Sequence, residues 1–172
     1  IAYRRRTERF VERVLEQPFE SVHGGPFRMI VYRNRLDGVE HVALVHGKID
    51  GKSAPLVRMH QVDLGADILG HAEARADYVK EAMRAITDHP GAGVMVMLRD
   101  PDPAWISKRI AGLDKDAAAA HALRDYGVGA QILLDLGVKD MIALSSSQPK
   151  PAALEGYGLR IVGWKSFDEL KG

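Results

Sequence analysis

The sequence predicts a mixed α/β (α+β) fold, in which an N-terminal β-meander is followed by alternating helices and strands. Two observations support this prediction. Short runs of β-branched residues separated by turn signals fill the first half of the chain, and apolar runs alternate with segments of helical periodicity in the second half. At 172 residues the chain is long enough for one full hydrophobic core, so we expect a single domain.

The composition excludes several classes of protein. No apolar run reaches the roughly 20 residues of a membrane span, so we expect no transmembrane helix and no membrane partner. The net charge of +1 provides no overall field to attract polyanions, so we expect no nucleic-acid partner. The chain has no cysteine, which excludes disulfides, thiol nucleophiles and thiolate metal sites, and favours a cytoplasmic location.

Residues 3–17 predict the first element, a charged amphipathic helix. Phe10, Val11, Val14 and Leu15 have spacings that share one helical face. Such a helix is either a solvated linker or a partner-binding segment.

Three short β-rich runs follow, at residues 27–33, 41–47 and 54–61. Turn signals at Asp37-Gly38 and Asp50-Gly51 separate them, so together they predict an antiparallel meander.

The second half of the chain predicts alternating helices and strands. Residues 71–88 have helical periodicity up to the stop at His89-Pro90. Residues 114–137 are rich in helix formers, and we expect Gly127 and Gly129 to break this helix. The other predicted elements are a buried strand at 93–98, a strand at 139–147, a short helix near Ala152 and a strand at 159–164.

Three stretches of the chain carry a family resemblance: "EHVALVHGKIDGKSAPLVRMH", "LRDYGVGAQILLDLGVKDMIAL" and "LEGYGLRIV". On these motifs, from about Pro26 to the C-terminus, the sequence resembles the GTP cyclohydrolase II family of riboflavin biosynthesis. The segment "LRDYGVGAQIL" with its "DLGV" continuation is the most specific, because glycines, an aromatic residue and a carboxylate recur in fixed order.

The N-terminal stretch "IAYRRRTERFVERV" is similar to the junction that follows a 3,4-dihydroxy-2-butanone 4-phosphate synthase domain in bifunctional riboflavin proteins. Together with the lack of an initiator Met, this implies the C-terminal part of such a fusion. We therefore expect residues 1–22 to form a linker helix from a preceding synthase domain, and residues 23–172 to form the GTP cyclohydrolase II-like domain. The expected partner is the fused or associated synthase, and the family's habit suggests a homodimer.

The resemblance implies a zinc site that this chain has lost. In the family, three cysteines hold a zinc ion that activates water to attack the purine five-membered ring, and formate and pyrophosphate are released. The three cysteine positions fall on Asp63, Ala74 and Ala76, of which only Asp63 could ligate a metal. We therefore predict that zinc is absent and that no metal site remains.

Other catalytic positions of the family have changed as well. The family's Gln-Glu-Gly-Arg run is replaced by Asp-Pro-Asp-Pro at residues 100–103, and its proton acceptor falls on Ala122. Its phosphate-attacking arginine is retained as Arg124. Because each lost group supports a different part of the reaction, we predict a non-catalytic domain that supports or regulates the synthase. The alternative is an active GTP cyclohydrolase II that uses Asp63 and His60 with a divalent metal.

Several anion-binding residues of the family are retained. They could cradle a nucleotide or a phosphate, or they could be residual architecture in which arginine stems pack and pair with neighbours. The residues are Arg58, His60, Arg124, Ser145 and Lys150.

A rebuilt metal site is the remaining hypothesis. His60, Asp63, Asp67 and His71 are residue types that bind zinc, but their spacing matches no compact ligand motif. A histidine near a strand end is typically a hydrogen-bonded structural residue, and we adopt this interpretation. No serine of the loop at 145–147 has an evident paired base, so we expect a polar turn there.

Overall fold

The computed structural model describes residues 8–72, 76–112, 117–149 and 152–171, with the backbone alone at 117–125, 152–153 and 171. Its centre is a mixed sheet of seven strands in the order β1-β2-β3-β5-β4-β6-β7. The strands are β1 (Val11–Ser21), β2 (Gly25–Asn34), β3 (Glu40–His46), β4 (Leu56–Gln61), β5 (Gly93–Leu98), β6 (Asp140–Leu144) and β7 (Arg160–Lys165). The helices are η1 (Leu64–Ile68), α2 (Tyr78–Asp88), α3 (Trp105–Ala111), α4 (Ala117–Asp135), α5 (Ala152–Glu155) and η2 (Phe167–Lys171).

The sheet has an antiparallel half and a parallel half. Strands β1, β2 and β3 form a meander, and β3 also pairs antiparallel with β5. Strand β4 lies between β5 and β6, parallel to both, and β7 pairs parallel with β6. The carboxyl ends of four neighbouring strands therefore meet at one edge of the sheet.

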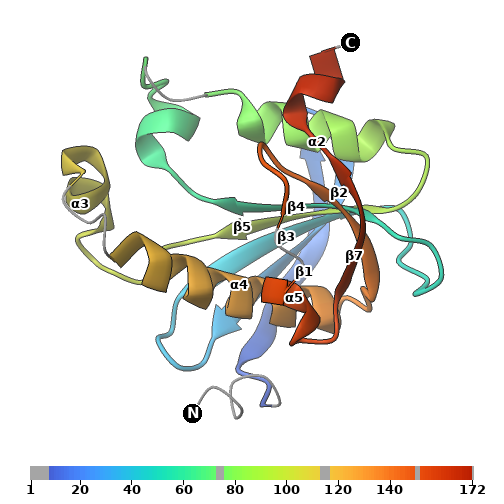
Figure 1. The fold of residues 1–172 in the computed structure, drawn as a ribbon, viewed down its shortest axis with the longest axis horizontal. Coiled ribbons are helices and arrows are strands. Elements are labelled where there is room, and N and C mark those ends of the chain that lie inside the picture. The colour runs from blue at the N-terminus through green and yellow to red at the C-terminus, as the bar shows by residue number, and fades with distance from the viewer. Residues whose placement is uncertain (1–7, 73–75, 113–116, 150–151, 172) are drawn as a thin grey trace.

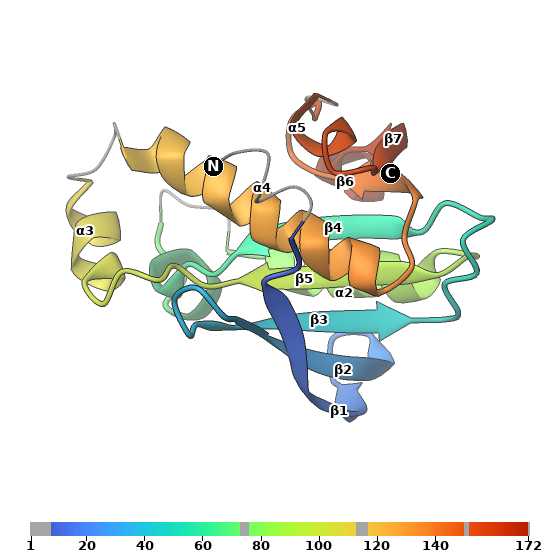
Figure 2. The same cartoon turned by 90° about the horizontal axis from the view of Figure 1, so that it is seen from below.

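Side chains of successive residues in β5 enter two different cores. Val94 and Val96 pack with α4 on one face of the sheet, whereas Met95 packs with α2 and η2 on the other. This follows from the two-residue period of a strand, and it requires a strand that is apolar on both faces. Figure 1 shows α2 and α4 on opposite sides of the sheet, and Figure 2 shows α4 running along its face.

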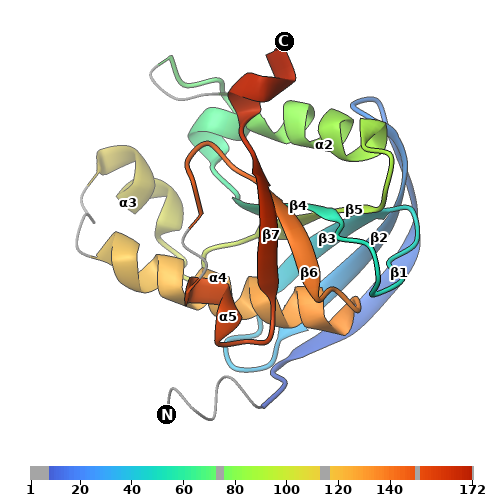
Figure 3. The same ribbon diagram turned by 45° about the vertical axis from the view of Figure 1, so that its right-hand side comes forward.

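The structure confirms the predicted mixed α/β fold, with the strands first. Helix α2 ends at Asp88, just before His89-Pro90, and β5 occupies the predicted buried segment. At the C-terminal end, β7 runs between α5 and η2, as Figure 3 shows. Within the described residues, no helix is both long and apolar enough to cross a membrane.

The helix expected at residues 3–17 is wrong from Val11 onward, where the chain forms β1; residues 1–7 lie outside the described residues. Strand β1 pairs with β2 from Val11 to Ser21, and these backbone hydrogen bonds override a weak helical periodicity. Because β1 is an edge strand exposed on both faces for most of its length, its sequence lacks the alternation that identifies a strand.

Two further expectations needed correction. The run at 54–61 contains β4, which is a parallel strand in the middle of the sheet and not the third strand of the meander. Helix α4 also continues through Gly127 and Gly129 without a break. Both glycines serve close packing, because a Cβ at Gly129 would collide with Met59 Sδ and one at Gly127 would lie 3.1 Å from Tyr157 Oη.

Candidate functional site

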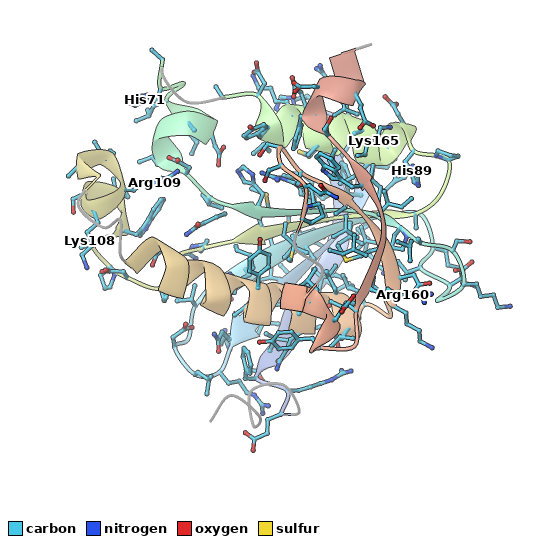
Figure 4. The ribbon with its side chains drawn as sticks, in the orientation of Figure 1. His71, His89, Lys108, Arg109, Arg160 and Lys165 are labelled. Atoms are coloured by element: carbon cyan, nitrogen blue, oxygen red, sulfur yellow. The ribbon has the colours of Figure 1, made fainter. Side chains whose placement is uncertain are left out.

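The candidate site lies where parallel strands β4 and β5 end, the position at which open α/β sheets commonly bind ligands. Arg58 and His60 are on β4, and Asp63 and Asp67 follow in the turn and the helix η1. Arg109 reaches the same turn from α3, which follows β5. Figure 4 labels Arg109 between α3 and η1, and His71 on the far side of η1.

His60 is buried and uses both ring nitrogens in hydrogen bonds. Its Nδ1 lies 3.2 Å from the Arg58 guanidinium, and its Nε2 lies 2.8 Å from Asp67 Oδ2. Because a guanidinium only donates, Nδ1 must accept, so Nε2 carries the proton and donates it to Asp67.

Burial lowers the pKa of His60, although Asp67 opposes this effect. A neutral imidazole with one nitrogen accepting and the other donating has no lone pair left for a metal or for proton abstraction. His60 is thus placed as a structural histidine that links β4 to η1.

The carboxylates that follow β4 are also engaged. Asp67 Oδ2 accepts a second hydrogen bond, from the Asp63 backbone N–H at 2.9 Å. Asp63 Oδ1 accepts from the Ala66 N–H at 3.3 Å, and its Oδ2 pairs with Arg109 Nε at 3.0 Å. Partial burial opposes ionisation of Asp63, but these two donors outweigh it, and the pKa of Asp63 is lowered.

Arg58 is held between two aromatic rings. Its Cζ lies 5.3 Å from the ring centre of Tyr78 and 5.0 Å from that of Phe167. Its Nε is buried and has no hydrogen-bond partner among the described residues, and burial lowers the pKa of the guanidinium. The charge of Arg58 is therefore stabilised by ring faces and His60, with no carboxylate bonded to it in the described part of the chain.

Ser145 lies at the end of β6 in a polar turn. Its Oγ donates to the Ser147 carbonyl at 2.6 Å, and its own carbonyl accepts from Trp164 Nε1 at 3.3 Å. The side chains of Ala122 and Arg124 on α4, and all of Lys150, lie outside the described residues. Of the five proposed anion-binding residues, the structure brings Arg58 and His60 together, and ligand binding by the set stays a prediction.

Three residues of this site have no signal in the sequence. Arg109, Tyr78 and Phe167 contact it from α3, α2 and η2, elements that follow β4 at long separations. The pair Asp63 and Arg109 spans 46 positions, which no local pattern encodes. The sequence offers Asp67 as a candidate metal ligand, whereas in the structure its carboxylate accepts a hydrogen bond from His60.

Comparison with known proteins decides the family. The model of the GTP cyclohydrolase II family matches residues 12–166, which include all strands but the first residue of β1. The chain belongs to the GTP cyclohydrolase II family. The match starts inside β1, within the segment that the sequence predicted to be a linker.

Relatives of this GTP cyclohydrolase II domain include proteins named for riboflavin biosynthesis. It is 40% identical to the monofunctional riboflavin biosynthesis protein RIBA 2 of Arabidopsis thaliana, with 95% of this chain and 35% of that protein covered. It is 38% identical to RibBA of Salinispora arenicola, with coverages of 95% and 42%.

A solved structure is also similar: RibBX, a two-domain 3,4-dihydroxy-2-butanone 4-phosphate synthase from A. baumannii. The TM-score is 0.59 at 27% identity, and the match covers 95% of this chain and 42% of RibBX. The chain thus spans less than half the length of these relatives.

The residues at the positions where the resemblance implies zinc ligands do not fit a zinc ion. Ala76 has no donor atom, Ala74 lies outside the described residues, and both carboxylate oxygens of Asp63 are bonded within the chain. Across residues 8–72, 76–112 and the other described segments, no three His, Asp or Glu side chains lie together in a way that could hold a metal.

Proposed function

We propose that this chain is a non-catalytic GTP cyclohydrolase II domain of riboflavin biosynthesis, which lacks the family's zinc site and supports or regulates a fused 3,4-dihydroxy-2-butanone 4-phosphate synthase. One observation carries the proposal. At the first family cysteine position, Asp63 is bonded to Arg109 and to the η1 backbone, and the other two positions hold alanines. A guanidinium thus satisfies the carboxylate that would otherwise be the one remaining metal ligand.

The comparisons support a synthase domain as the partner. RibBX is described as a two-domain synthase, and the matched region makes up 42% of it. The RibBA relatives are likewise more than twice as long as their matched region. The proposal also includes a homodimer, which the resemblance to the family implies. It includes a cytoplasmic location, which the lack of cysteine favours.

Metal analysis of the purified chain tests the loss of the zinc site. We expect less than stoichiometric zinc after growth in zinc-supplemented medium, with no loss of folded structure on chelation. One zinc per chain that a chelator removes with partial unfolding would contradict the proposal.

The supporting role is tested in the fused protein. Strand β1 belongs to the sheet of this domain. The deletion variant therefore ends before Glu8, so that no strand of the domain is left behind. We expect this deletion to lower synthase turnover or to change the oligomeric state measured by light scattering. Unchanged turnover and an unchanged assembly would remove the supporting role.

A regulatory role requires a ligand. Arg58 and Ser145, on β4 and just after β6, are the described members of the proposed phosphate-binding set, which also includes Arg124 and Lys150. Calorimetric titration with GTP, flavin mononucleotide and ribulose 5-phosphate separates regulation from support alone. Saturable binding of one of these that Arg58→Met weakens supports regulation, and no binding of any of the three leaves support as the function.

A further inference from the structure

The segment that leads into β1 is hydrogen-bonded to the carboxyl-terminal half of α4. Gln131 is 4% exposed, and its Oε1 accepts from the Phe10 N–H at 2.9 Å while its Nε2 donates to the Glu8 carbonyl at 2.6 Å. From the other side, the Arg35 N–H donates to the Phe10 carbonyl at 2.8 Å. Residues 8–10 are therefore held between α4 and the end of β2.

One turn further along α4, Asp135 binds side chains around the same segment. Its Oδ2 accepts from Tyr32 Oη and from Arg13 Nε, each at 2.7 Å, and its Oδ1 pairs with Arg9 at 3.2 Å. Tyr32 is 0% exposed, so part of this cluster is shielded from water. Burial opposes ionisation of Asp135, but the hydrogen bonds from Tyr32 and Arg13 outweigh it and lower its pKa.

The buried contacts carry this attachment. Arg9 is 64% exposed and its ion pair is screened by solvent, so on its own it contributes little. In contrast, the two Gln131 bonds are partly buried and satisfy backbone groups of residues 8 and 10, beside the half-buried Phe10. We call Gln131 and Asp135 the α4 clamp.

We infer that the α4 clamp anchors the segment through which a fused synthase is attached to this domain, so that the effect of the domain on the synthase depends on the clamp. The inference rests on the proposed function, under which the synthase is fused on the N-terminal side of this domain. Helix α4 also carries Ala122 and Arg124, and at a rise of about 1.5 Å per residue Arg124 lies about 10 Å along the helix from Gln131. The same helix therefore carries both these positions and the α4 clamp.

The test uses the fused, full-length protein with Gln131→Leu and Asp135→Asn. Arg13→Gln is a second variant, because it weakens the clamp from the surface without altering the core. Asp140→Asn is the matched control, since Asp140 makes a similar two-bond pair with Arg160 at 3.1 and 2.8 Å, away from the junction. The measurements are amide hydrogen exchange of the peptide covering residues 8–13 and synthase turnover.

We expect Gln131→Leu to speed exchange at Phe10 by about tenfold or more, because the hydrogen bond of the Phe10 N–H is lost, and we expect Asp135→Asn and Arg13→Gln to speed exchange by a smaller factor, because they loosen the segment around it. We also expect them to lower synthase turnover towards that of the domain deletion, while Asp140→Asn changes neither. Unchanged exchange, or unchanged turnover in a protein whose synthase does depend on the domain, overturns the inference. A synthase that is indifferent to deletion of the whole domain overturns the proposed function instead.

Discussion

The carboxylate of Asp63 lies 3.0 Å from Nε of Arg109, so the residue that the resemblance aligns with the first family cysteine is paired with a guanidinium from α3. The pair joins the turn after β4 to the helix after β5. Arg109 supplies a positive charge at the place where the resemblance to the family implies a metal ion.

The Asp63 and Arg109 pair is expected to stabilise the fold only slightly. Arg109 is 70% exposed, and solvent screens such pairs to less than about 1 kcal/mol. A double-mutant cycle with Asp63→Asn and Arg109→Gln, measured by urea unfolding, gives the coupling free energy. A coupling of zero would show that the two side chains do not interact in solution.

Removal of the Asp67 carboxylate is expected to lower the free energy of unfolding by a larger amount. Asp67→Ala leaves the buried His60 Nε2–H and the Asp63 N–H without their acceptor, which predicts a loss of about 2–4 kcal/mol in the free energy of unfolding. Asp140→Ala is the control, because that carboxylate is exposed. Equal unfolding midpoints for the two variants would contradict the structural role of Asp67.

Acidification is expected to destabilise the protein in the range where buried histidines gain a proton on unfolding. Burial lowers the pKa of His41 to about 4, and burial also lowers that of His60, so the unfolded chain binds protons that the folded chain does not. Stability is therefore full above about pH 6.5 and falls between about pH 6.5 and pH 4, by up to about 3 kcal/mol from His41.

Urea unfolding at several pH values checks this dependence. His41→Gln has no titrating group and keeps an acceptor for the Arg99 N–H, so its stability should fall less steeply over this range. Asp63 and Asp135, whose pKa values are lowered, contribute stability that is lost only as the pH falls below about 4. Equal stability of the natural chain at pH 7 and pH 5 would mean that His41 is not buried in its neutral form.

Restoring the family residues is expected to restore zinc binding. The triple variant Asp63→Cys, Ala74→Cys and Ala76→Cys supplies three thiolates, which hold zinc with one position open. One equivalent of zinc in the purified variant is the expected result, measured by metal analysis. The same variant with Ser instead of Cys at position 63 serves as the control, and a triple variant that binds no zinc would contradict the assignment of these positions.

The central elements of the fold were predictable from the sequence because local signals agree with the packing. Strand β5 is apolar throughout and is buried on both faces, and α2 ends at a proline stop. Strand β1 was not predictable in this way. Its residues Val11, Val14 and Leu15 fit a helical face, and only pairing with β2 makes it a strand.

The part of the site on β4 and in the turn after it was predictable, because its residues lie close together in the sequence. The sequence indicates Arg58 and His60 as candidate anion-binding residues and Asp63 as a candidate metal ligand. Their partners Arg109 and Phe167 come from distant segments of the chain, and their contacts exist only once the sheet has assembled.

The most direct test of a non-catalytic domain is formate release from GTP by the purified chain, in buffer with added zinc and magnesium. We expect formate no faster than in a protein-free blank, because the Asp63 carboxylate is bonded to Arg109 and Ala66 and no thiolate is present. Formate release above the blank that Asp63→Ala abolishes would contradict the account, and would make Asp63 part of a working metal site.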